Sequence, residues 1–110
     1  MKHLRTTKRD AFEVLHDTGT SQAAMMTLAP GESSSEGSDN EHAWAEQWLY
    51  VVSGEAVVRG GKKTIKLAPG SLLLIEKGEP HEIENPGDTP LVTLNIYAPP
   101  AYDDDGEPLY

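Results

Sequence analysis

Short apolar segments, each followed closely by a turn-forming pair of residues, constrain the fold of this chain more than any other feature. The segments are rich in β-branched, aromatic and aliphatic residues, as strands are. They are Phe12–Leu15, Gln22–Leu28, Gln47–Val52, Ala56–Arg59, Thr64–Leu67, Leu72–Ile75, His81–Glu84 and Leu91–Tyr97. Between them stand pairs such as Pro-Gly, Ser-Gly, Gly-Gly and Lys-Gly, which favour tight turns. No stretch combines 3.6-residue periodicity with a helix cap, so the pattern predicts an all-β barrel or sandwich.

A short internal echo supports two similar halves. The sequence Leu-Ala-Pro-Gly occurs at residues 28–31 and again at residues 67–70, each time at the end of an apolar segment. Two interlocked sheets of similar build would produce such a repeat, although four residues can also match by chance.

The chain is short enough to be described as one domain. Its 110 residues predict a single barrel domain over 1–110, with a basic arm at 1–10 and a C-terminal strap at 98–110. Tyr102 and Tyr110 of the strap are candidates to pin it to the barrel or to a second subunit. The sequence contains no cysteine, which excludes disulfides, thiolate metal sites and a cysteine nucleophile.

Charge argues against several classes of partner. From residue 11 onward there are 17 acidic and 5 basic side chains, so the body of the protein would repel a phosphate backbone. We therefore expect no nucleic-acid binding. No apolar run is long enough to cross a membrane, and residues 1–9 lack the apolar stretch of a signal peptide. A soluble cytoplasmic protein without a membrane partner is the expectation.

One segment carries a specific motif. Gly70 is followed by five residues, then Glu76-Lys77-Gly78, two residues, His81, three residues and Asn85. This resembles the second motif of the cupin superfamily, G-x5-P-x-G-x2-H-x3-N, with Glu76 in place of the proline. Strand alternation puts His81, Ile83 and Asn85 on one face. The resemblance implies a double-stranded β-helix (the cupin, or jelly-roll, barrel) with His81 pointing into it.

The first cupin motif is only partly kept. Its form is H-x-H, three or four residues, E, six residues, G. Counting back from Gly54 puts Gln47 at the carboxylate position, His42 at the second histidine position and Asn40 at the first. The resemblance thus implies His42, Gln47 and His81 as metal ligands, with Asn40 as a further candidate. Hydrogen bonding of Gln47 to a neighbour is about as plausible as ligation.

Further residues are candidates for the pocket wall. Alternation places Leu49 on the same face as Gln47, and Trp44 follows His42 by two residues. We expect the pocket to be lined by Trp44, Met26, Leu49 and Ile83.

Outward-facing apolar residues predict a subunit contact. Trp48 and Tyr50 would face away from the barrel, where an aromatic stripe suits another protein surface better than water. Leu72–Ile75 is apolar throughout, which is typical of a strand buried on both faces. Together with the dimers typical of small cupins, this predicts a homodimer.

The predicted chemistry is that of a weak divalent metal site. Two imidazoles and an amide oxygen suit Zn, Ni, Fe or Mn, but the amide adds no negative charge. The resemblance implies a metal-dependent enzyme acting on a small oxygenated molecule, with oxygenase, isomerase and lyase reactions all open and no catalytic residue assigned. The alternatives are a barrel that binds a small ligand without turnover and a structural cupin with no metal.

Overall fold

A computed structural model describes residues 1–6, 11–34 and 42–110. The strands are β1 (Phe12–Asp17), β2 (Gln22–Leu28), β3 (Glu46–Ser53), β4 (Ala56–Gly60), β5 (Lys63–Leu67), β6 (Leu72–Ile75), β7 (Glu82–Glu84) and β8 (Leu91–Ala98). All eight predicted segments are strands, with ends that differ by at most two residues. The described residues contain no helix that could cross a membrane.

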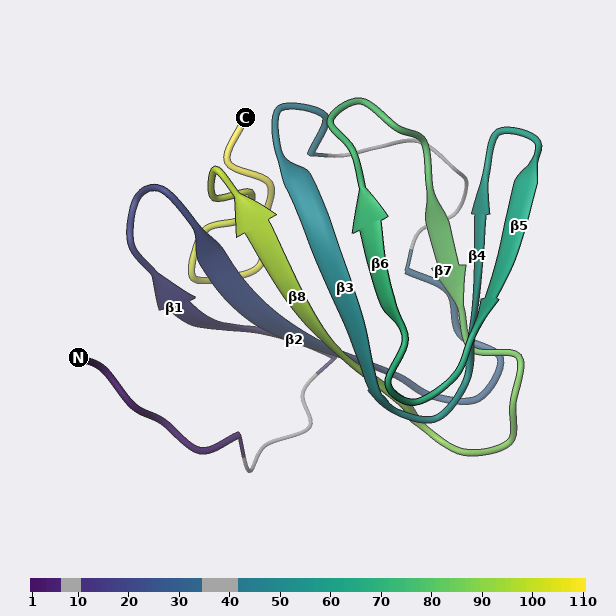
Figure 1. The fold of residues 1–110 in the computed structure, drawn as a ribbon. Coiled ribbons are helices and arrows are strands. Elements are labelled where there is room, and N and C mark those ends of the chain that lie inside the picture. The colour runs from purple at the N-terminus through teal and green to yellow at the C-terminus, as the bar shows by residue number, and fades with distance from the viewer. Residues whose placement is uncertain (7–10, 35–41) are drawn as a thin grey trace.

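Two antiparallel sheets face each other. One has the order β1-β2-β8-β3-β6 and the other β5-β4-β7, so strands far apart in sequence are neighbours (Figure 1). This architecture confirms the all-β, double-stranded β-helix prediction. Because the two sheets pack face to face, each has one inner face and one outer face.

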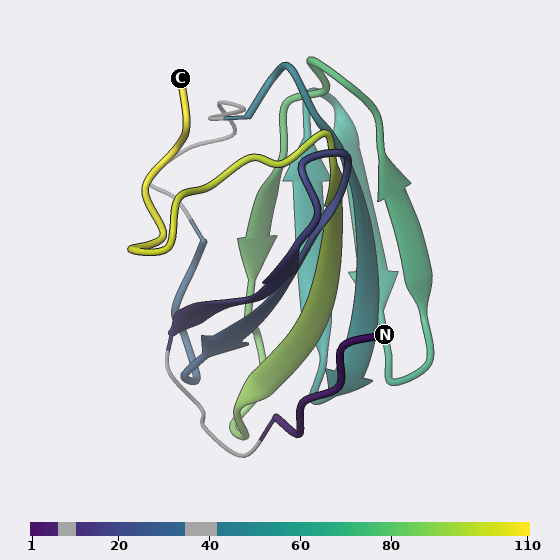
Figure 2. The same cartoon turned by 90° about the vertical axis from the view of Figure 1, so that its left-hand side faces the viewer.

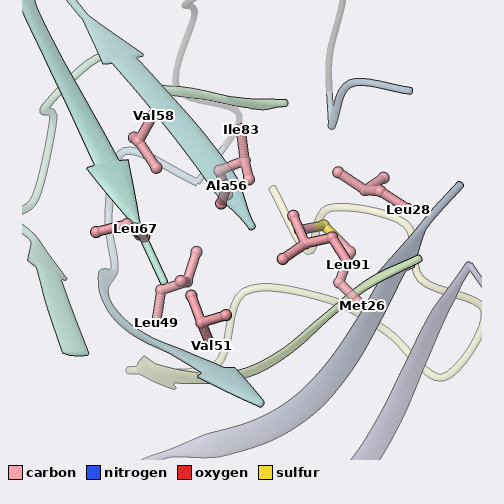
Figure 3. Close-up of a cluster of buried hydrophobic side chains, with 9 residues drawn as sticks. All are labelled: Met26, Leu28, Leu49, Val51, Ala56, Val58, Leu67, Ile83 and Leu91. Carbon is pink, nitrogen blue, oxygen red and sulfur yellow. The ribbon is translucent and has the colours of Figure 1, made fainter. Parts of the chain in front are cut away.

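The apolar core fills the space between the sheets. Inner side chains from both sheets meet in one cluster (Figure 3), which consists of Met26, Leu28, Leu49, Val51, Ala56, Val58, Leu67, Ile83 and Leu91. Alternation explains the membership, since β2 is buried at every second residue. The cluster occupies one part of the interior and leaves another part free for polar side chains.

The internal echo corresponds to two equivalent turns. Gly31 and Gly70 adopt φ values of 83° and 91°, which favour glycine. Each follows a proline, and Pro-Gly at the two central positions is typical of a type II turn. In the first turn the amide of Glu32 donates to the carbonyl of Ala29, and in the second that of Ser71 donates to Ala68. The four-residue repeat is therefore structural, and it ends β2 and β5 in the same way.

The outer face of the larger sheet is apolar. Tyr50 of β3 lies opposite Leu72 of β6, and Trp48 lies opposite Leu74. The exposed fractions are 41% for Tyr50, 39% for Trp48 and 61% for Leu72. The outward aromatic stripe is confirmed, but the expectation that Leu72–Ile75 is buried on both faces is wrong for a single chain. Only Ile75 of this strand is fully buried, because Leu72 and Leu74 lie on the outer face of an edge strand, where they stay exposed.

Candidate metal and ligand site

A cavity of about 340 Å³ opens between the sheets, beside the apolar core. It combines two histidines and a glutamine with aromatic and aliphatic side chains. Its lining consists of Ala11, Phe12, Met26, Leu28, Glu32, Ser33, Ser34, His42, Gln47, His81, Ile83, Tyr97, Tyr102 and Gly106. The structure therefore brings the three predicted ligand residues into one cavity.

His81 reaches the cavity through the turn that precedes β7. The amide of Glu79 donates to the carbonyl of Glu76, and Gly78 takes a φ of 75°, so the chain reverses just before the histidine. His81 is 9% exposed. Its Nδ1 lies 3.1 Å from the carbonyl oxygen of Glu79. Because a carbonyl can only accept, Nδ1 carries the proton in the neutral ring, and Nε2 keeps the lone pair that a metal needs.

Gln47 and His42 come from β3 and the turn before it. The amide of Ala45 donates to the carbonyl of His42, which closes this turn. Gln47 lies opposite Tyr97 of β8 and Ile75 of β6, both buried, so its side chain faces inward. In the part of the chain that the structure describes, Gln47 Oε1 is buried and has no hydrogen-bond partner. A buried carbonyl oxygen in that state is costly unless something else binds it.

The two histidine rings stand at a separation that suits one shared ion. Their centroids are 5.0 Å apart and their planes are inclined by 47°. Rings that bind one ion through nitrogens at about 2.0–2.1 Å have centroids roughly 5 Å apart. No group of three His, Asp or Glu side chains within the described ranges could hold an ion. A metal here would depend on two imidazoles and the Gln47 amide oxygen, a set that fits a weakly held divalent transition metal.

The other predicted pocket residues are divided between three places. Met26 and Ile83 line the cavity. Leu49 faces inward but lies in the apolar cluster, one inner row further along β3 than Gln47. Trp44 faces the C-terminal segment instead, where its Nε1 donates to the carbonyl of Pro100 at 3.0 Å. Asn40 lies outside the described residues.

Three aromatic residues that the sequence did not assign to the pocket line the same cavity. Tyr97 packs edge-on against His42 at 5.0 Å, and Tyr102 lies 4.8 Å from Phe12 and 5.9 Å from His42, measured between centroids. Tyr97 follows from strand register, because it pairs with Gln47 across β8 and β3. Tyr102, a candidate to pin the strap, is buried against Phe12 within the barrel. Neither residue carried a signal for the pocket, since their placement depends on how the strap folds back.

Charge is distributed unevenly around the site. None of the described residues that line the cavity is lysine or arginine, whereas Glu32 is among them. The Arg59–Glu84 ion pair lies elsewhere, on β4 and β7, and both side chains are partly exposed. The hydrogen bond from Arg59 holds the pKa of the Glu84 carboxyl below its usual range. The described part of the lining thus offers no lysine or arginine with which to bind an anionic ligand.

Comparison with known proteins defines the class. Residues 24–97 match the cupin domain family Cupin_2, and the chain belongs to this family. The structure is similar to that of BH2720 from Bacillus halodurans, with a TM-score of 0.81 and 25% identity over 88% of this chain and 76% of that one. The recognition of a small cupin from its motifs is therefore confirmed.

Two further relatives have descriptive names. A tetracenomycin polyketide synthase protein, TcmJ of Streptomyces glaucescens, is 36% identical over 65 residues, which are 59% of this chain and 42% of that protein. This chain thus matches less than half of the curated relative. A predicted oxalate decarboxylase from Thermotoga maritima is 29% identical, with a TM-score of 0.63 over 72% of this chain and 66% of that one.

Proposed function

We propose that this cupin binds one divalent transition metal through His42, Gln47 and His81, and holds a small oxygenated molecule against it. The observation that carries the proposal is the pair of buried imidazoles, 5.0 Å apart, in the same cavity as an amide oxygen without a hydrogen-bond partner. Titration of the metal-free protein with Zn²⁺, Ni²⁺, Fe²⁺ and Mn²⁺ tests it. One site per chain supports the proposal, and the absence of binding by all four ions contradicts it.

The chain's own residues would set up the site before the ion arrives. The hydrogen bond between His81 Nδ1 and the Glu79 carbonyl fixes the ring with Nε2 available, as outer partners commonly do for metal-binding histidines. The aromatic and aliphatic part of the lining lowers the local polarity, which strengthens electrostatic interactions at the site. The metal, when bound, would supply a Lewis acid for a ligand oxygen or activate water or dioxygen.

The lining favours an uncharged ligand. Phe12, Tyr97 and Tyr102 supply aromatic surface, Met26 and Ile83 supply aliphatic surface, and the described lining has no lysine or arginine. A ligand with apolar carbon and one or two oxygens directed at the histidines matches this distribution. The names of the relatives point to oxygen-bearing carbon compounds, a polyketide in one case and oxalate in the other. A dianion such as oxalate fits the described lining less well, since that lining has no lysine or arginine to oppose its charge.

A second candidate is ligand binding without turnover. The third donor is an amide in place of a carboxylate, which lowers metal affinity, and the described lining offers Glu32 as its one carboxylate. The two candidates are separated by incubating the metal-loaded protein with a small ligand and searching for a product by mass spectrometry. A new product would favour an enzyme. Intact ligand recovered in full after prolonged incubation would favour the binding module.

Replacing Gln47 by glutamate is expected to tighten metal binding about 10-fold or more, because a carboxylate adds the negative charge that the amide lacks. The comparison is made by competitive titration with a chromophoric chelator. Glu46→Gln is the matched control, since the Glu46 side chain accepts a 2.8 Å hydrogen bond from Trp48 Nε1 outside the cavity. Unchanged or weaker binding in Gln47→Glu would remove residue 47 from the ligand set.

We also propose that the apolar outer face of the larger sheet makes this protein a homodimer. Trp48 and Tyr50 with their β6 partners form a continuous exposed patch of the kind that interfaces bury. Light scattering is expected to give twice the chain mass, and Trp48→Glu with Tyr50→Glu is expected to give a monomer. Thr64→Glu, on the exposed β5 strand, controls for added charge. A wild-type mass equal to one chain at all concentrations would contradict the proposal.

A further inference from the structure

The segment after β8 folds into a small hairpin that forms part of the cavity wall. The amide of Leu109 donates to the carbonyl of Ala101, and that of Asp103 donates to the carbonyl of Glu107. This pairing places Tyr102 and Gly106 in the cavity lining. Figure 2 shows the segment, in yellow, leaving the upper end of β8 and doubling back on itself toward the C-terminus. Residues at the far end of the chain therefore help to close the site.

One buried side chain fastens this hairpin to the barrel. Gln22, the first residue of β2, is 2% exposed. Its Nε2 donates to the carbonyl of Tyr102 at 2.7 Å. Its Oε1 accepts from the amides of Ala101 at 3.2 Å and Tyr102 at 3.1 Å. The carboxamide thus pairs with the backbone of residues 101 and 102 much as a neighbouring strand would, and this pairing needs both a donor and an acceptor.

The fastened hairpin determines where Tyr102 lies. The Tyr102 ring is packed between Phe12, at 4.8 Å, and Tyr97, at 5.2 Å, and it approaches His42 at 5.9 Å, all between centroids. Tyr102 is 6% exposed and His42 only 1%. The burial of His42 therefore depends in part on Tyr102, which follows β8 and is not part of the two main sheets. Gln22 attaches the hairpin at residues 101 and 102, beside the contacts that Trp44 makes with Pro100 and Tyr110.

We propose that Gln22 is a positioning residue for the cavity, and that its contacts with Ala101 and Tyr102 keep the C-terminal hairpin closed over His42. Access to His42, by solutes or by a chelator removing a bound ion, then requires this hairpin to open. The first consequence is independent of any metal. The second rests on the proposed metal-binding function.

The test compares Gln22→Met with a matched control. Methionine keeps the volume of glutamine but cannot form the three backbone hydrogen bonds. Asn85→Leu is the control, because Asn85 is equally buried and also makes three backbone hydrogen bonds, to Leu28, Thr89 and Gly87, away from the hairpin. Both substitutions lower stability by a similar mechanism, but only one releases the hairpin.

The metal-free readout is the rate at which diethyl pyrocarbonate modifies His42, measured by peptide mass spectrometry with the exposed His3 as internal reference. Gln22→Met loses the three bonds to residues 101 and 102 and a fourth to Asp17 Oδ2. This loss is expected to accelerate modification of His42 about 10-fold or more, while Asn85→Leu stays near the wild-type rate. Gln22→Glu places a carboxylate oxygen against the Tyr102 carbonyl and the Asp17 carboxylate, to which the amide donates, so it should also accelerate modification. Equal His42 rates in wild type and Gln22→Met, or equal acceleration in Asn85→Leu, would overturn the proposal.

The second readout is the rate at which EDTA removes Zn²⁺ from the loaded protein. Gln22→Met is expected to release zinc faster than wild type and Asn85→Leu at the same rate. If wild type binds no zinc, the proposed metal function fails, yet the modification of His42 still decides whether Gln22 positions the hairpin. If zinc binds and Gln22→Met accelerates neither readout, the positioning role fails and the metal function stands.

Discussion

His81→Ala is expected to weaken divalent-metal binding by at least about 100-fold, beyond the 10- to 100-fold typical of losing an outer partner, because it removes one of two strong donors. His42→Ala should have an effect of the same order. With only an amide as third donor, neither variant keeps enough ligands to hold an ion. The measurement is the dissociation constant for Zn²⁺ from competition with a chelator, supported by circular dichroism to show that each variant is folded.

His16→Ala is the control for these substitutions. His16 lies in β1, opposite Ala23, and is not among the residues that line the cavity. Its replacement should leave zinc affinity unchanged. Retention of wild-type affinity in His81→Ala, or a comparable loss in His16→Ala, would show that zinc binds at another site.

Gly54→Ala is expected to destabilise the fold by about 3 kcal/mol, the sum of a steric term and a backbone term. A Cβ at this position would lie 2.5 Å from the Pro90 carbonyl oxygen and 2.9 Å from Leu91 Cα, both backbone atoms that cannot rotate away. The φ of 82° adds strain for any side chain. For a domain of this size we expect the thermal midpoint to fall by more than about 10 °C.

Gly70→Ala separates the two contributions. Gly70 has a φ of 91° but nothing within 4 Å of the added Cβ, so only the backbone term of about 1 kcal/mol applies. Thermal or urea unfolding of the two variants measures the difference. Equal destabilisation would mean that the close approach of β3–β4 to residues 90–91 is not the reason for glycine at position 54.

The strands and the inward positions of the proposed ligands Gln47 and His81 were predictable because they follow from local rules. Alternation alone places Gln47 and Ile83 inward and Trp48 outward, and burial agrees in each case. The spacing from Gly70 to His81 fixes a turn and a strand, so the histidine's position follows from the motif. The two side chains share a cavity because β3, which carries Gln47, and β7, which follows His81, lie in sheets that face each other.

The remainder of the site depends on contacts between distant parts of the chain. Gln22 and Tyr102 are 80 residues apart, and no sequence period reports their contact. Trp44 was expected at the pocket, but its indole N–H is satisfied by Pro100 and its ring packs on Tyr110, so the tail determines where it lies. The exposure of Leu72 likewise follows from the position of β6 at a sheet edge, which strand composition does not reveal.

The most direct test of the proposed metal site is to locate the ion itself. Crystals grown from metal-free protein and soaked with Ni²⁺ are examined by anomalous diffraction at the nickel edge. We expect one strong peak in the cavity, about 2.1 Å from a nitrogen of His42 and a nitrogen of His81, with the Gln47 amide oxygen next to it. A peak at the surface histidines alone, or none in the cavity of a crystal that binds nickel elsewhere, would contradict it.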